Sequence, residues 1–334
     1  MSRPVVSSAL VPFLMFLAGC ASQQTLTMRV LKPAPVDLGR HDLVAVDRFE
    51  GDGCLELGRE LGAALRAARN PLTGQADFEV LDRGDVDRML EDLRRRRGTA
   101  FDQESMALLQ RWKEADVLIR GGVQEHRVVE EVTMQETLDP KTGAIRQLFV
   151  RSGQARVRVQ LEIVTGAGEQ VIDRVTLTGS ENARTTALDA EPKPLDHAQL
   201  LARARARVTS TYLDRLLPHE ETVAVTLQTD GDLPELQAGN GFARTGDWDE
   251  AARSYQAAEQ RATGNLADRR WKALHNLGVA HLFAGRFDQA RTALKSAYNL
   301  EQDETILGTL NYVGQREEEM RRLQEQSRAA SPGR

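Results

Sequence analysis

Residues 43–65 read LVAVDRFEGDGCLELGRELGAAL, and this sequence indicates the fold class of the surrounding region. Its first part is a short apolar run rich in β-branched residues, which is typical of a buried strand. Gly51-Asp52-Gly53 interrupts the run, and leucines then recur at helical spacing from Leu57 to Leu65. The stretch therefore predicts a buried strand followed by a helix that packs on it.

The alternation of strands and helices continues to about residue 230. We expect strands at 78–81 and 116–120, with helices between them. Long strands at 123–138 and 145–164, another at 170–179, a helix from Asp196 to Leu217 and a strand at 221–228 follow. These elements make 41–230 an α+β domain with a mixed sheet flanked by helices.

A family resemblance rests on VAVDRF (44–49), ELGRELGAAL (56–65), FEVLDRGDVDRMLED (78–92) and ADVLIRGGV (115–123). This arrangement is similar to the CsgG-like superfamily over roughly residues 40–228. That group includes the curli secretion lipoprotein and the penicillin-binding-protein activator lipoprotein of the LpoB type. The resemblance implies a fold and no catalytic residues. It also implies one of two roles, pore formation or partnership with other envelope proteins.

Residues 233–325 contain an internal repeat with an offset of 39 residues. Its matched positions are Gly239/Gly278, Gly246/Gly285, Trp248/Phe287, Ala251/Ala290, Tyr255/Leu294 and Ala258/Ala297. The pattern is similar to the tetratricopeptide repeat, an all-α stack of helix pairs with a usual period of 34. The extra residues fit near Gly264-Asn265. We expect a degenerate third copy at 305–323, turning at Gly314, and a disordered tail at 326–334.

Stacked helix pairs offer a concave surface that can bind a peptide. By repeat register, the polar side chains expected to face this groove are Asn240, Arg244, Lys272, His275 and Asn276. Amides and cations of this kind can hold an extended peptide or its carboxylate. The alternative is that the repeats form a packing or self-association module in which these side chains are solvated.

The first 40 residues predict a secretory targeting signal followed by a lipid anchor. Arg3, an apolar run at 5–18 and small residues before Cys20 are the parts of a secretory signal, and the run is too short to span a bilayer. Leu17-Ala18-Gly19-Cys20 resembles the lipobox of bacterial lipoproteins. The resemblance implies removal of 1–19, acylation of Cys20 with fatty acids such as palmitate, and a tether at 20–40. No Asp follows Cys20 directly, which implies attachment to the outer membrane, facing the periplasm.

Composition excludes several classes of function. The chain has 334 residues, with 44 Lys+Arg against 49 Asp+Glu, and this net charge of −5 argues against nucleic-acid binding. Cys20 and Cys54 are its only cysteines, so it has no disulfide framework. Its six histidines have no metal-ligand spacing, and no G-x-S-x-G, phosphate-loop or H-E-x-x-H motif occurs. We expect no enzymatic activity, no cofactor and no metal.

These observations predict a non-enzymatic adaptor or activator that binds other envelope proteins, and leave homo-oligomer formation open. The alternative is a subunit of an oligomeric outer-membrane secretion channel of the CsgG type. A strand that faces lipid needs an unbroken apolar row. Charged residues of 123–138 occupy both faces, and Arg151 interrupts the apolar row of 145–164. The sequence therefore favours the adaptor.

Overall fold

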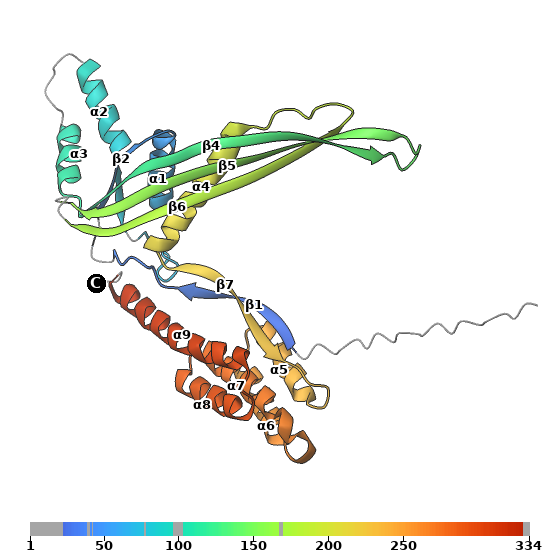
Figure 1. The fold of residues 1–334 in the computed structure, drawn as a ribbon. Helices are drawn as coiled ribbons and strands as arrows, with labels where there is room; N and C mark the ends of the chain where they lie inside the picture. Colours follow the sequence, from blue (N-terminus) through green and yellow to red (C-terminus); the bar gives the residue numbers. More distant parts are fainter. Residues whose placement is uncertain are drawn as a thin grey trace, which may run out of the picture. The chain divides into compact units, whose positions relative to one another are not determined.

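The structure is a computed structural model that describes residues 23–38, 41, 43–76, 78–95, 103–166 and 170–329. The described residues fall into two compact units (Figure 1). The sheet unit consists of residues from Leu31 to Glu221 together with the chain from Glu319 onward. The repeat unit consists of Thr222–Glu318 and the chain up to Val30. Cys20 and the predicted signal peptide lie outside the described residues.

The described part of the sheet unit contains a five-stranded sheet in the order β3-β2-β4-β5-β6. Its strands are β2 (Leu43–Glu50), β3 (Glu79–Asp82), β4 (Val117–Leu138), β5 (Ile145–Thr165) and β6 (Val171–Leu188). Strands β3 and β4 both run parallel to β2, whereas β5 runs antiparallel to both of its neighbours, β4 and β6. The sheet is therefore mixed, as predicted.

Helices cover both faces of this sheet. Helices α1 (Cys54–Ala67) and α4 (His197–Leu216) pack on the face that carries Val44 and Val46. Helix α3 (Gln103–Lys113) packs on the opposite face, where Ala45 lies, and α2 (Arg83–Arg95) precedes it. This alternation of neighbouring side chains follows from the period of two along a strand. The α+β class is confirmed, whereas the strands predicted at 116–120 and 123–138 form one continuous strand, β4.

The close packing of α4 on the sheet depends on a glycine. A Cβ atom on Gly179 of β6 would lie 2.0 Å from the carbonyl oxygen of Ala204 on α4. Asp196 caps the helix, because its side chain accepts a hydrogen bond from the backbone N–H of Gln199 at 2.9 Å. The helix start predicted at Asp196 is therefore confirmed.

A tether was predicted at 20–40, but a strand occupies much of it. Strand β1 (Gln23–Lys32) pairs with β7 (His219–Gln228) in a separate two-stranded sheet of the described chain. Leu26 and Met28 of β1 pack into the apolar core of the repeat unit. The tether prediction is wrong here because the pairing partner lies far along the chain. The alternation of apolar and polar residues in β1 was the signal available.

The repeat unit is helical. Its elements are α5 (Pro234–Arg244), α6 (Trp248–Arg261), the 3-10 helix η1 (Gly264–Arg269), α7 (Arg270–Phe283), α8 (Phe287–Leu300) and the first part of α9 (Glu304–Ala329). The repeated glycines permit close helix pairs, because a Cβ on Gly239 would lie 2.3 Å from the Tyr255 ring and one on Gly278 would lie 2.5 Å from Leu294. The extra residues expected near Gly264 form η1.

Two predictions at the C-terminus need correction. Helix α9 runs without a turn through Gly314, so the expected third helix pair is a single helix. Residues 326–329 belong to that helix rather than to a disordered tail, and 330–334 lie outside the described residues. Glycine costs a helix interior about 1 kcal/mol, which tertiary packing overrides here. Along the described chain, no helix combines the length and apolarity needed to cross a membrane.

Candidate functional site

The residues predicted to face a peptide groove lie on α5 and α7. Asn240, His275 and Asn276 have no exposed surface, and the side chain of Lys272 is 16% exposed. Arg244 is exposed at the end of α5 and makes no hydrogen bond to any described residue. The structure therefore brings four of the five together inside the repeat unit and leaves Arg244 apart.

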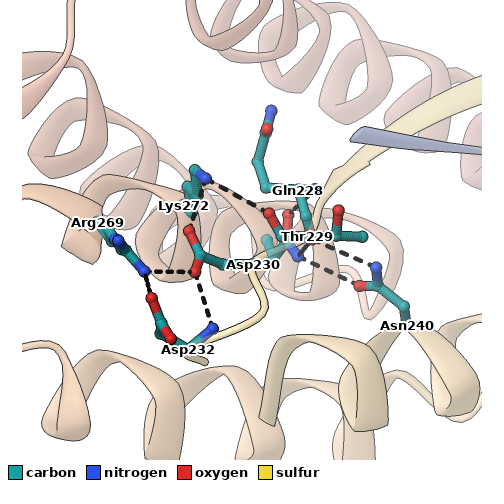
Figure 2. A network of polar contacts seen from close by, with 8 residues as sticks. Gln228, Thr229, Asp230, Asp232, Asn240, Arg269 and Lys272 are labelled. Carbon is teal, nitrogen blue, oxygen red and sulfur yellow. Dashed lines mark hydrogen bonds and ion pairs between the residues drawn. The ribbon is translucent and has the colours of Figure 1, made fainter. Parts of the chain in front are cut away.

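The end of strand β7 occupies the position between these side chains (Figure 2). The Oδ1 atom of Asn276 accepts a hydrogen bond from the backbone N–H of Gln228 at 2.7 Å. The backbone carbonyl of Gln228 accepts from the side-chain amides of Asn276 at 2.9 Å and Asn240 at 3.3 Å. Both main-chain groups of Gln228 are thus satisfied by side chains of the repeat helices.

A buried carboxylate lies two residues further along the chain. Asp230 is 8% exposed at its side chain and accepts from Lys272 Nζ at 2.7 Å and from Arg269 Nη1 at 2.9 Å. Lys272 also donates to the carbonyl of Thr229 at 3.4 Å, and the backbone N–H of Asp232 donates to Asp230 at 3.0 Å. Figure 2 shows these cations on one side of the segment and Asn240 on the other. We call the four side chains that hold residues 228–230 the strand clamp: Asn240, Arg269, Lys272 and Asn276.

The amides of the clamp are themselves held in one orientation. The hydroxyl of the buried Tyr255 donates to Asn240 Oδ1 at 2.8 Å, and Asn276 Nδ2 approaches the same oxygen at 3.2 Å. The oxygen of Asn240 therefore faces these donors, which leaves its nitrogen to meet the carbonyl of Gln228. By contrast, neither side-chain amide atom of the buried Gln228 has a hydrogen-bond partner among the described residues. The clamp thus recognises the main chain of Gln228, not its side chain.

His275 stands beside the clamp as a neutral group. Burial lowers its pKa, and a contact to the Asn276 amide oxygen at 3.3 Å opposes that shift. Its other ring nitrogen lies 3.4 Å from the Thr309 hydroxyl of α9. A neutral, enclosed imidazole fixes the helices and does not supply charge to a ligand.

The predicted open groove is therefore corrected. Amides and a lysine do hold an extended segment, but the segment is residues 228–230 of the same chain. Sequence reasoning missed Arg269, Asp230 and Tyr255 as members of the site. The available signal was Asp230-Gly231-Asp232, which places acidic residues between a predicted strand and a predicted helix. Only the tertiary structure shows that Lys272 of α7 and Arg269, the residue before α7, contact these acidic residues.

The carboxylate of the clamp makes its stability depend on pH. Burial by itself would raise the pKa of Asp230, but hydrogen bonds from Lys272 and the Asp232 backbone, with the charges of Lys272 and Arg269, outweigh it and lower that pKa. A lowered pKa contributes stability above the unfolded value of about 3.9, and that stability is lost as the pH falls through the folded value. We therefore expect Asp230→Asn to destabilise the repeat unit at pH 7, and the difference from wild type to shrink below about pH 4.

This prediction is checked by urea unfolding between pH 7 and pH 3 in a Trp112→Phe background, so that Trp248 and Trp271 of the repeat unit report. Asp268→Asn is the matched control, because it removes the same charge from an exposed position of the same unit. If the difference in unfolding free energy between Asp230→Asn and wild type stayed constant with pH, the clamp would not stabilise the ionised form of the Asp230 carboxylate.

Comparisons with known proteins identify no family. No family model matches the chain, and no curated protein is significantly similar to it. Among solved structures, the chain is similar to the PelC dodecamer from Paraburkholderia phytofirmans, with 16% identity over 59% of this chain and 100% of that one and a TM-score of 0.25. A minor lipoprotein from Acinetobacter baumannii is 11% identical over 54% of this chain and 99% of that one, with a TM-score of 0.22. A hypothetical protein from Chlamydia trachomatis is 12% identical over 42% of this chain and 72% of that one, with a TM-score of 0.21. TM-scores this low carry no argument about function.

Proposed function

We propose that this protein is a lipid-anchored component of the bacterial cell envelope that acts as a non-enzymatic adaptor or activator for other envelope proteins. Leu17-Ala18-Gly19-Cys20, which resembles a lipobox, supports attachment through Cys20 to the outer membrane with the body in the periplasm. Such an anchor requires more than one acyl chain, since each buried CH₂ contributes only about 0.8 kcal/mol.

The observation that supports the adaptor role is a set of exposed apolar side chains on the repeat helices. The strand clamp binds an extended main chain through paired amides and a carboxylate through Lys272 and Arg269, and its occupant is residues 228–230 of the same chain. Because residues 228–230 fill the clamp, we place partner binding on the outer surface of the repeat unit. Phe242, Leu300 and Leu307 are between 40% and 52% exposed there.

Partner capture tests this role. The lipidated full chain is crosslinked in intact envelopes and compared with a variant in which Phe242, Leu300 and Leu307 are changed to serine. A matched variant changes Met134, Leu138 and Ile145, which are exposed on the long strands of the sheet unit, to serine. We expect defined partners that the first variant loses and the second retains. A large detergent-stable ring that conducts ions in lipid would instead favour the channel subunit.

The anchor has its own prediction. We expect Cys20→Ala to abolish lipid labelling and to move the protein from the membrane fraction to the soluble fraction, because the acyl chains are then absent. Cys54→Ala is the control, since Cys54 is a half-buried free thiol at the start of α1 and should leave fractionation unchanged. If Cys20→Ala stayed with the membrane, the anchor proposal would fail while the adaptor role could still be tested.

A further inference from the structure

An open hollow of about 980 Å³ lies in the sheet unit beside the carboxyl end of β2. The chain leaves β2 through α1 to reach β3 on one side, then passes through α2 and α3 to reach β4 on the other side of β2. This is a topological switch point, and open α/β sheets bind ligands at such points, outside the carboxyl ends of the strands. The volume also lies within the usual range for small-molecule sites.

Arginines from different elements line this hollow: Arg48 of β2, Arg83 of α2 and Arg120 of β4. Carboxylates hold them in place. Asp87 accepts from Arg48 Nε and Nη2 at 2.9 and 2.8 Å and from Arg83 Nε at 3.1 Å. Because one carboxylate serves two arginines, this group keeps a net positive charge.

The same arrangement recurs on the other side of the hollow. Glu162 accepts from Arg120 Nε at 3.0 Å and also bonds to Arg174. Hydrogen bonds from Arg120 and then Arg174 lower the pKa of Glu162, so that it is ionised at neutral pH. Among the described residues, Nη1 of Arg48 and of Arg120 and both Nη atoms of Arg83 make no hydrogen bond. The hollow therefore lies between guanidinium groups that carboxylates hold in place and whose remaining N–H groups can donate to a ligand.

The floor and the rim of the hollow indicate what can enter. Gly122 lies on the floor, and a Cβ atom there would meet nothing within 4 Å, so the space above it is open. Asp47 and Glu50 of β2 also line the hollow. A bare polyanion would be repelled by these carboxylates. A molecule with hydroxyl groups as well as an acid group can donate to them while its acid group binds arginine.

We propose that this hollow is a binding site for an anionic sugar, whose phosphate or carboxylate binds among Arg48, Arg83 and Arg120 and whose hydroxyls donate to Asp47 and Glu50. Asp87 and Glu162 act as positioning residues for the arginines. This site is independent of the strand clamp and of the adaptor role, because every residue in it belongs to the sheet unit.

Calorimetric titration of the full chain in detergent tests the proposal, with glucose 6-phosphate and glucuronate as probes and with glucose and inorganic phosphate as controls. We expect saturable binding of at least one anionic sugar, stronger than that of phosphate, and no binding of glucose. Arg120→Gln should weaken binding at least about tenfold, since it removes charge-assisted hydrogen bonds. Gly122→Val should weaken binding, because its side chain enters the open space above Gly122 and blocks part of the hollow. The charge control is Arg156→Gln, an exposed arginine of β5 that does not line the hollow.

Several results would overturn the proposal. The first is the absence of saturable binding of either anionic sugar to the wild-type chain. Equal weakening by Arg156→Gln would mean that general surface charge attracts the probe. Unchanged binding in Gly122→Val, with the fold verified by circular dichroism, would place the probe elsewhere. Inorganic phosphate that bound as strongly as glucose 6-phosphate would remove the sugar from the proposal.

Discussion

Replacing Asn276 with alanine is expected to lower the free energy of unfolding of the repeat unit by about 2–4 kcal/mol. Asn276 is fully buried and its amide accepts from the N–H of Gln228 and donates to the carbonyl of Gln228. Alanine leaves that buried N–H without a partner, and Asn240 alone then serves the carbonyl. An unsatisfied buried polar group costs about 1–3 kcal/mol, and the volume lost from the interior adds to it.

Amide hydrogen exchange of the full chain measures this loss of stability in each element separately. We expect faster exchange in α5, α7 and the end of β7, with the sheet unit unchanged. Asn299→Ala is the matched control, because it removes an exposed amide from α8 of the same unit and should change stability by less than about 0.5 kcal/mol. Equal protection in Asn276→Ala and wild type would show that the clamp does not hold β7. Equal loss of protection in both units would show that the effect of the substitution is not confined to the repeat unit.

Gly239→Ala is expected to destabilise the repeat unit by about 2–3 kcal/mol, because the new methyl group overlaps a buried ring. The added Cβ would lie 2.3 Å from Tyr255, whose hydroxyl is tied to Asn240. The ring therefore cannot move aside without disturbing the clamp. The helices must separate instead, which removes apolar contacts between α5 and α6.

The same helix supplies the control. Gly241 lies two residues further along α5, and a Cβ there would meet nothing within 4 Å. Alanine in an open helix interior is favoured over glycine by about 0.5–1 kcal/mol, so Gly241→Ala should stabilise the unit. Urea midpoints of the two variants should thus move in opposite directions from wild type. Equal shifts would show that helix propensity, rather than contact with Tyr255, governs this helix.

Much of the fold was predictable because its signals are local. The alternation of Val157, Val159 and Leu161 with polar and charged residues identified β5, and these three residues are at most 1% exposed. The residues between Asp196 and Leu217 identified α4 within one residue at each end. The glycines at 239 and 278 identified close helix pairs, since only a side chain without a Cβ fits at those contacts. In each case the pattern and the packing involve residues of one segment or of adjacent segments.

The predictions that fail depend instead on contacts between segments that are distant in the sequence. The sequence predicts a tether where β1 lies, because β1 becomes a strand only when it pairs with β7, a segment far along the chain. It predicts that Asn240 and Asn276 face an open groove, because repeat register gives the direction of a side chain but does not show which segment packs against it. The hollow between Arg48, Arg83 and Arg120 was not predicted at all, since these arginines lie on separate elements.

Hydrophobic period and glycine placement act within a few residues, so the sequence alone indicates most of the elements between 41 and 228 and the repeat offset. Packing determines which segment fills the clamp and which charged groups meet around the hollow. Those choices depend on contacts between residues distant in sequence, and no local pattern encodes the partner of a backbone N–H or of a guanidinium group.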